Sequence, residues 1–363
     1  MTGSGRPSRT PIGIDVGTRT LKAVQLQSAG GHYRLQRATV VPRLSPGEAL
    51  NEREVNWLES ILRRQGFVGV RVVLAAPAEQ VFAEVLELPA RSSGAPIEQI
   101  ARMELARNHN RDPGGFEMCS WDVPVAPTHR ESSQNTLLYA AACDHRAANG
   151  VMDLFEQVDL QVEALDLRCC AVFRACRSLL AGKTGIRGVL DMGWNGARLG
   201  LFYDDVLIFE RTFDGVGLTK IHDAVLKRLN VEEQVADYLV RQAVCPSDAG
   251  PADEDAQPET LGRRDPSDMI RKLVDAQIDK ITEEMRVSLF YLNHRYSEVE
   301  VEQLLLVGGA ATMPGLAEAL ARFASVKIKM ATTATLVECN PAGRWATTTM
   351  LTEAIGLAQY MGG

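Results

Sequence analysis

A strand-like run that ends in Asp-x-Gly occurs twice in this chain, once within 11–41 and again within 189–213. The turn carries Asp15 in the first copy and Asp191 in the second. Two more strand-like runs follow each turn and are separated by turn-forming residues, a pattern that predicts a three-stranded antiparallel meander. Because an internal repeat means a repeated structural unit, we expect two similar lobes.

The size and composition of the chain agree with a two-lobed globular protein. Its 363 residues exceed the usual size of one compact domain, and 45% of them are hydrophobic. The net charge of −7 disfavours nucleic acid as a partner, since nucleic-acid binding needs a basic surface. We find neither a secretory signal nor an apolar run of about 18 residues, so the expected location is cytoplasmic. Seven cysteines without C-x-x-C spacing indicate reduced thiols rather than disulfides or zinc ligands.

The pattern between the two copies differs from the pattern on either side. Strand-like runs, one helical segment and several prolines within 78–144 indicate a small inserted α+β subdomain. The predicted organisation is a disordered tail at 1–10, a first lobe at 11–77 and 145–182, the inserted subdomain at 78–144, and a second lobe at 183–363 with a mobile acidic loop at 246–268.

Both Asp-x-Gly turns carry groups that suit a phosphate. Glycine lets a phosphate approach the backbone N–H groups, and hydroxyl and ammonium groups add hydrogen bonds. A carboxylate beside such a turn can hold Mg²⁺ through water, and we assign this role to Asp15 and Asp191. For either turn alone, the alternative is an aspartate that merely caps a strand turn. The predicted phosphate contacts are Asp15, Gly17, Thr18, Lys22, Asp191 and Gly193.

A diglycine, Gly308-Gly309, follows a buried strand-like run and precedes a helical segment. Bare backbone at this position lets a flat base or ribose pack against it, although a tight strand–helix turn is the alternative. Together with the two phosphate turns it predicts an ATP site between the lobes, with lobe closure that depends on the nucleotide.

The order of the two phosphate turns and the diglycine resembles the superfamily of actin, heat-shock chaperones and sugar kinases. Within it, the chain resembles the PilM family of type IV pilus assembly. This resemblance implies an actin-like (ribonuclease H-like) α/β fold with duplicated mixed sheets and a small inserted α+β subdomain. The matching segments are IGID at 12–15, KAVQL at 22–26, VLDMG at 189–193, FERTF at 209–213, EMRVSLFY at 284–291, LVGG at 306–309 and EAIGLA at 353–358.

The resemblance also suggests roles for residues that show no pattern of their own. It implies that Gly215, Lys280 and Glu283 contact the nucleotide, together with Arg286 on the same helix as the two latter residues. A solvated helix face is the alternative for the residues of that helix. The same resemblance implies that Asp166 positions the attacking water, which makes it the candidate catalytic residue.

Several positions depart from the superfamily pattern. Leu167 replaces a proline that often follows the catalytic acid, Val216 replaces a common glycine, and Val240 stands where a lysine is frequent. Trp194 adds bulk beside the second phosphate turn. The sequence therefore leaves open whether ATP is hydrolysed and even whether it is bound.

The family resemblance implies a scaffold on the cytoplasmic face of the inner membrane. Its expected partner is the N-terminal tail of a bitopic PilN-like protein, held in a groove between the first lobe and 78–144, with pilus motor components as further candidate partners. The membrane is reached only through partners, and ATP acts as a conformational ligand rather than as fuel.

Two other functions remain as alternatives. A small-molecule kinase would use Asp166 as its catalytic carboxylate. A division filament protein like FtsA would need a C-terminal amphipathic tether, whereas this sequence ends at Gly362-Gly363 directly after the expected last helix.

Overall fold

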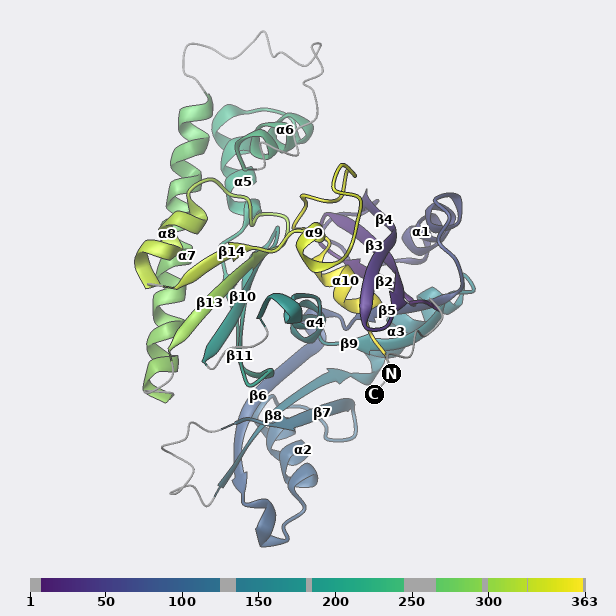
Figure 1. Cartoon of the computed structure of the whole chain (residues 1–363), viewed down its shortest axis with the longest axis vertical. Helices are drawn as coiled ribbons and strands as arrows, with labels where there is room; N and C mark the ends of the chain where they lie inside the picture. The colour runs from purple at the N-terminus through teal and green to yellow at the C-terminus, as the bar shows by residue number, and fades with distance from the viewer. Residues whose placement is uncertain are drawn as a thin grey trace.

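The described residues, 8–124, 135–180, 185–244, 266–295, 300–324 and 326–361, form three β-sheets in this computed structural model. Figure 1 shows the first sheet at the labels β4, β3, β2 and β5 on the right, the second beside the long helix α7, and the third in the lower part of the molecule. The first sheet has the order β4-β3-β2-β5-β9, and the short β1 pairs with the end of β3. Its strands are β1 (Ser8–Arg9), β2 (Ile12–Val16), β3 (Thr20–Ala29), β4 (His32–Pro42), β5 (Arg71–Ala75) and β9 (Gln161–Asp166).

The second sheet repeats this topology. In each sheet an antiparallel meander leads, and two parallel strands follow on the other side of its first strand. The predicted duplication of mixed sheets is therefore confirmed. The strands of the second sheet, in spatial order, are β12 (Val206–Asp214), β11 (Gly196–Tyr203), β10 (Ile186–Met192), β13 (Val301–Val307) and β14 (Lys327–Met330).

Amphipathic helices cover the sheets. In α1 the side chain of Asn51 accepts a hydrogen bond from Glu54 N and starts the helix, and Val55, Leu58 and Leu62 form its buried face. The helix α7, 30 residues long, flanks the second sheet (Figure 1). The helices outside the inserted subdomain are α1 (Glu52–Arg64), α3 (His145–Glu156), α4 (Arg168–Leu180), α5 (Leu218–Leu229), α6 (Glu233–Val244), α7 (Pro266–Arg295), α8 (Leu316–Ala324), α9 (Thr333–Leu336) and α10 (Thr352–Ala358).

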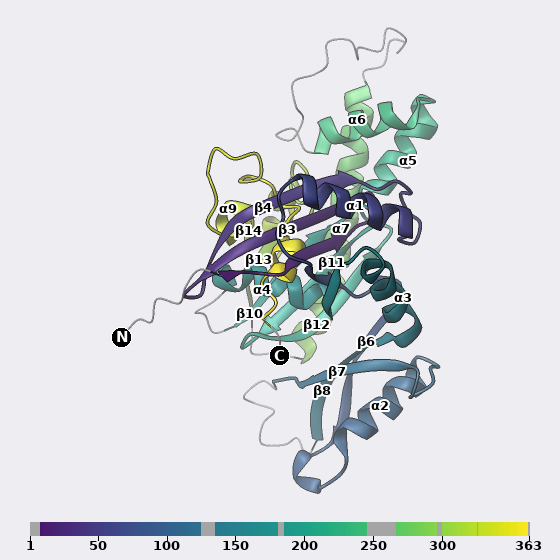
Figure 2. The same cartoon turned by 90° about the vertical axis from the view of Figure 1, so that its right-hand side faces the viewer.

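The inserted residues form the third sheet, with β8 in its centre and α2 on one face (Figure 2). Side chains alternate along β8. Leu138 and Ala140 pack beneath α2, whereas Tyr139 and Ala141 join the large core that includes the second lobe. The elements of this subdomain are the 3₁₀ helix η1 (Ala78–Gln80), β6 (Val81–Pro89), η2 (Arg91–Ser93), α2 (Ile97–Asn108), β7 (Phe116–Asp122) and β8 (Asn135–Asp144).

Three details differ from the predicted organisation. The sequence predicts a disordered tail that reaches residue 10, but Ser8–Arg9 pairs with β3; residues 1–7 lie outside the described residues. Most of the acidic loop expected at 246–268 also lies outside them, and α7 already begins at Pro266. The helix α10, expected within the second lobe, packs on α4, β2 and β3 of the first lobe. The other predicted domain boundaries remain predictions.

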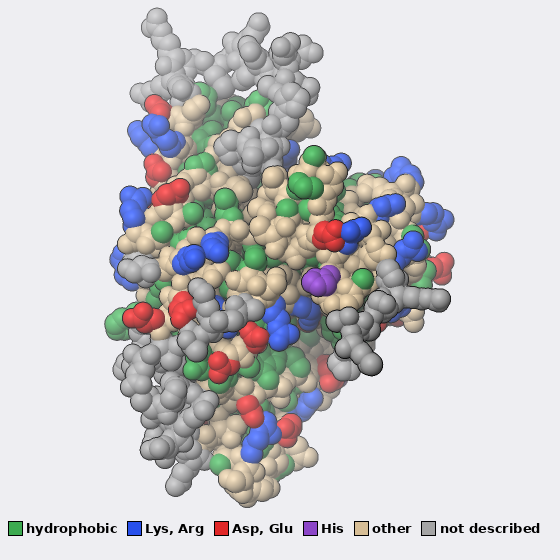
Figure 3. Space-filling view, viewed as in Figure 1, with side chains coloured by type: hydrophobic (Ala, Val, Ile, Leu, Met, Phe, Trp, Pro, Cys, Tyr) green, Lys and Arg blue, Asp and Glu red, His purple; other side chains and the backbone are tan. Residues whose placement is uncertain are grey.

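The surface of the described residues carries mixed charges. The face in Figure 3 shows Lys and Arg side chains interspersed with Asp and Glu side chains. No helix in the described part of the chain is both long enough and apolar enough to cross a bilayer.

Candidate functional site

The two Asp-x-Gly turns line one cleft of about 1690 Å³. Because β2 and β10 hold equivalent places in the two sheets, the turns that follow them are equivalent too, and both reach this cleft. The predicted site residues that line it are Asp15, Gly17, Thr18, Lys22, Asp191, Gly193, Gly308 and Gly309. Their part in nucleotide binding remains a prediction.

Asp15 lies buried at the end of β2. It stands opposite Lys22 in the β2–β3 register, and its Oδ2 accepts a hydrogen bond of 2.6 Å from Lys22 Nζ. The other carboxylate oxygen, Oδ1, is buried and has no hydrogen-bond partner. A buried carboxylate oxygen without a donor is costly, and a hydrated cation in the cleft would relieve that cost.

The ammonium group of Lys22 keeps its charge despite burial. Burial alone lowers the pKa of Lys22, but the negative charges of Asp15, Glu353 and Asp191 outweigh this effect and leave that pKa raised. A positive charge is thus maintained at the first turn, where it can pair with a phosphate oxygen.

Asp191 occupies the corresponding place at the end of β10. Burial raises its pKa, and the neighbouring Arg168 and Arg198 oppose this rise. Gly308 lies so close that a Cβ there would stand 2.4 Å from Asp191 Oδ1, and its φ of +89° also favours glycine. The first glycine of the diglycine is therefore required by contact with the second turn.

Arg168 and Glu353 lie next to each other, buried beside the two aspartates. Arg168 Nε lies 3.3 Å from Glu353 Oε1. Burial raises the pKa of Glu353 to about 8 against the opposing charge of Arg168. The neighbouring carboxyl group of Glu353 is in turn the main cause of the raised pKa of Arg168. Neither residue was predicted from the sequence, because both read as ordinary charged residues near helix starts.

The raised pKa of Glu353 predicts a pH-dependent stability. The folded protein binds this proton more tightly than the unfolded chain, so the free energy of unfolding should fall as the pH rises from about 4.5 to about 8. One proton limits the slope to about 1.4 kcal/mol per pH unit. Urea unfolding at a series of pH values measures this slope. Glu353→Gln should make the slope smaller than in the wild type, because only the contribution of Asp191, whose pKa is also raised, then remains. Equal slopes for the two proteins would contradict the prediction.

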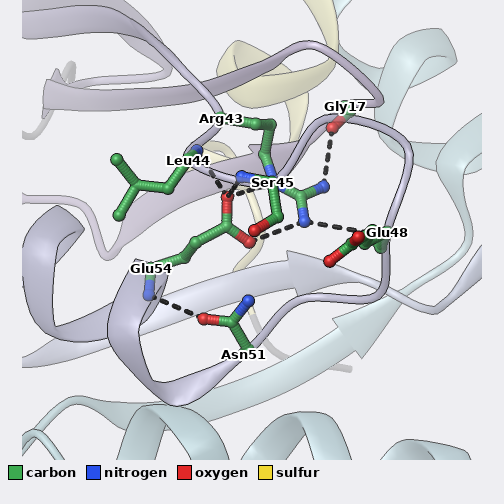
Figure 4. Close-up of polar contacts among 7 residues, drawn as sticks. All are labelled: Gly17, Arg43, Leu44, Ser45, Glu48, Asn51 and Glu54. Atoms are coloured by element: carbon green, nitrogen blue, oxygen red, sulfur yellow. Dashed lines mark hydrogen bonds and ion pairs between the residues drawn. The ribbon is translucent and has the colours of Figure 1, made fainter.

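A buried ion pair supports the first turn from behind (Figure 4). Arg43 donates from Nε and Nη2 to the two oxygens of Glu54, at 2.8 and 2.7 Å. Its Nη1 also donates to Gly17 O at 3.2 Å, and Gly47 N donates to Thr18 O at 3.0 Å. The segment after β4 thereby fixes the backbone of the turn.

Glu54 is held by more than Arg43. Its Oε1 also accepts hydrogen bonds from Leu44 N at 2.8 Å and Ser45 N at 3.2 Å. Burial raises the pKa of Glu54, but the hydrogen bonds from Arg43 and Ser45 outweigh burial and lower that pKa. Asn51 followed three residues later by Glu54 has the spacing of a capping box, a signal that could have singled out this glutamate.

Arg19 bridges the cleft from the first turn to the second lobe. Its guanidinium group donates to Glu233 Oε1 at 2.9 Å and to Asp237, and lies 4.6 Å above the ring of Trp194. His222 Nε2 lies 3.0 Å from Asp237 Oδ1. We call these residues the Arg19 bridge. His222, Glu233 and Asp237 lie close enough to share a metal ion, but Arg19 already pairs with both carboxylates.

Some predicted site residues do not line the cleft. The carboxylate of Asp166 accepts hydrogen bonds from Arg174 Nη1 and from Leu167 N, both at 2.8 Å, so it is turned toward α4. Lys280 Nζ donates to Gly215 O at 3.0 Å, and neither of these residues lines the cleft.

Glu283 lies on the exposed face of α7 and pairs there with Arg286. Both side chains lie on the solvent-exposed face of the helix, and their contact with the nucleotide remains a prediction.

Two sheets of the same strand order, with their duplicated turns in one cleft, define an actin-like protein. A family model described as type IV pilus assembly protein PilM matches residues 13–252. The chain therefore belongs to the PilM family of type IV pilus assembly proteins, as its sequence resemblance implied.

Solved structures of low sequence identity share this fold. A PilM–PilN type IV pilus biogenesis complex matches with a TM-score of 0.74 at 19% identity, over 96% of this chain and 97% of that chain. The ethanolamine utilization protein EutJ from Carboxydothermus hydrogenoformans matches with a TM-score of 0.52 at 12% identity, over 99% and 92%. The archaeal actin homologue Ta0583 matches with a TM-score of 0.50 at 11% identity, over 96% and 98%. These matches confirm the actin-like fold.

Proposed function

We propose that this pilus assembly protein binds ATP with Mg²⁺ between its lobes and holds the N-terminal tail of a PilN-like inner-membrane protein. The observation that supports the nucleotide site is the buried, unpartnered Oδ1 of Asp15 in the same cleft as Asp191. Around these two carboxylates lie the cations of Lys22 and Arg168, so the site offers ligands for both Mg²⁺ and phosphate.

The proposed nucleotide spans the cleft from the turns to the diglycine. Asp15 and Asp191 would hold Mg²⁺ through water, and the backbone at Gly17 and Gly193 would face the phosphates. The bare backbone at Gly308-Gly309 would receive the adenosine. The cleft of about 1690 Å³ is large enough for a nucleotide.

The role of ATP that we propose is conformational. The Arg19 bridge joins the first turn to α6, so a ligand at that turn acts on the contact between the lobes. Asp166, the residue with which a kinase or an ATPase would act, has its carboxylate bound to Arg174 and Leu167 N. This arrangement favours a scaffold over a small-molecule kinase.

The proposed partner follows from family membership and from the matching solved structure, which is a complex of PilM with PilN. The N-terminal tail of a PilN-like protein would lie in a groove between the first lobe and the inserted subdomain. The protein would then work at the cytoplasmic face of the inner membrane, attached through this partner, and motor components would be further candidates for contact.

Isothermal titration with ATP–Mg²⁺ tests the site. Asp15→Ala and Asp191→Ala should each weaken the affinity by at least about tenfold, because each removes a charged ligand. Asp122→Ala is the matched control, since this aspartate pairs with Arg91 on the exposed surface of the inserted subdomain and should leave the affinity unchanged. Failure of the wild type to bind ATP–Mg²⁺, or equal binding by all variants, would overturn the assignment.

A further inference from the structure

The inserted subdomain is bonded directly to the second lobe. The indole Nε1 of Trp121 on β7 donates to Leu207 O on β12 at 3.1 Å. Tyr139 on β8 stands opposite Trp121 in the register, and the two rings are stacked with centroids 4.8 Å apart. This aromatic pair fixes the face of the subdomain that does not carry α2.

The hydroxyl of Tyr139 extends the contact to a charged residue. It donates to Glu210 Oε2 on β12 at 3.1 Å. Burial raises the pKa of Tyr139 far above its ordinary value, so the hydroxyl stays protonated and remains a donor. The other oxygen of Glu210, Oε1, lies 3.2 Å from Arg198 Nε. Glu210 is thus shared between the inserted subdomain and the second sheet.

Arg198 completes a path to the cleft. It lines the cleft and stands directly opposite Asp191 in the β10–β11 register. Its positive charge lowers the pKa of Asp191 against the effect of burial. Glu210 pairs with Gly200 across β11–β12, two residues along the strand from Arg198, so Asp191, Arg198 and Glu210 share one face of the sheet.

We propose that Tyr139, Glu210, Arg198 and Asp191, which we call the subdomain relay, couple nucleotide binding in the cleft to the position of the inserted subdomain. This inference rests on the proposed function. Arg198 pairs with Glu210 and lies opposite Asp191 in the strand register, so its positive charge acts on both carboxylates. With a Mg²⁺–nucleotide bound, Asp191 would have a counter-charge of its own, so Arg198 would engage Glu210 more fully and hold Glu210 as the acceptor for Tyr139.

The coupling that we propose between the nucleotide and the peptide is positive. A subdomain fixed on the second lobe presents its part of the partner groove in one position, which reduces the ordering cost of peptide binding. The nucleotide and the peptide should therefore strengthen each other's binding. By thermodynamic linkage the factor is the same in both directions, and couplings of this kind commonly amount to about fivefold or more.

The test measures the affinity for a synthetic peptide of the N-terminal residues of the PilN protein from the same organism, with and without ATP–Mg²⁺. The wild type should bind the peptide at least about fivefold more tightly with the nucleotide. In Tyr139→Phe, which keeps the stacked ring and loses the donor, the ratio should fall to about one. Tyr33→Phe, on β4 in the first lobe, is the control and should retain the wild-type ratio.

Hydrogen exchange of the amides in β7 and β8 gives a second readout. ATP–Mg²⁺ should slow this exchange in the wild type and in Tyr33→Phe but not in Tyr139→Phe. A stability loss in Tyr139→Phe with the full ratio retained would show a merely structural hydroxyl and overturn the relay. Independent binding of nucleotide and peptide by the wild type would overturn the relay and leave the proposed function standing. A wild type that binds no nucleotide would overturn both.

Discussion

Gly356→Ala should lower the free energy of unfolding by about 3 kcal/mol or more, because it overpacks a contact between two backbones. Gly356 lies in α10, and a Cβ on it would stand 1.8 Å from Ala171 O in α4. Neither helix can retreat freely, since α10 also packs on β2, where a Cβ on Gly13 would stand 2.2 Å from Ala354 O. Urea unfolding followed by circular dichroism measures the loss.

Gly150→Ala is the matched control for this substitution. Gly150 lies inside α3, and a Cβ on it would meet nothing within 4 Å. Alanine at an open helix position should raise the stability by about 0.5–1 kcal/mol. A loss in Gly356→Ala no larger than about 1 kcal/mol would mean that α10 does not pack as closely on α4 as described.

Glu54→Ala should cost about 3–5 kcal/mol, the range for a buried ion pair that loses one partner. The side chain of Glu54 is 0% exposed and that of Arg43 is 3% exposed, so the guanidinium group would stay buried without its counter-charge. The backbone amides of Leu44 and Ser45 would lose their acceptor as well. Because Arg43 also holds Gly17 O, the affinity for ATP–Mg²⁺ should weaken together with the stability.

Glu59→Ala on the same helix is the control, because it removes a glutamate from an exposed ion pair instead of a buried one. Glu59 pairs with Arg63, whose side chain is 81% exposed, and such surface pairs contribute less than about 1 kcal/mol. The double change Arg43→Met with Glu54→Ala should recover part of the stability, because no charge is then left buried. Equal losses in Glu54→Ala and Glu59→Ala would contradict the role assigned to the buried pair.

The sequence predicted the duplicated fold because its main signals are local. Asp15 and Asp191 each end a strand and begin a glycine turn, and this pattern is visible within a few residues. Because the two copies share this local pattern, their sheets have the same strand order. The two equivalent turns then line the same cleft. The diglycine could be recognised in the same way, from a buried strand before it and a helix after it.

The residues that the sequence did not reveal act through partners far along the chain. Arg19 meets Asp237, and Arg168 meets Glu353, across separations that no local pattern encodes. Asp166 illustrates the converse: its place in the chain resembles that of a catalytic acid, but the direction of its carboxylate is set by Arg174, which no local pattern predicts.

The return of α10 to the first lobe has a consequence for synthesis on the ribosome. Residues 11–182 include every strand of the first sheet beyond the short β1, yet this half lacks the helix that covers Gly13 and Ala171 until residues 352–358 have been translated. The first lobe is therefore synthesised first, but its packing is completed only when the last helix has been made. A nascent chain must keep that apolar surface from aggregating while the entire second half emerges and folds.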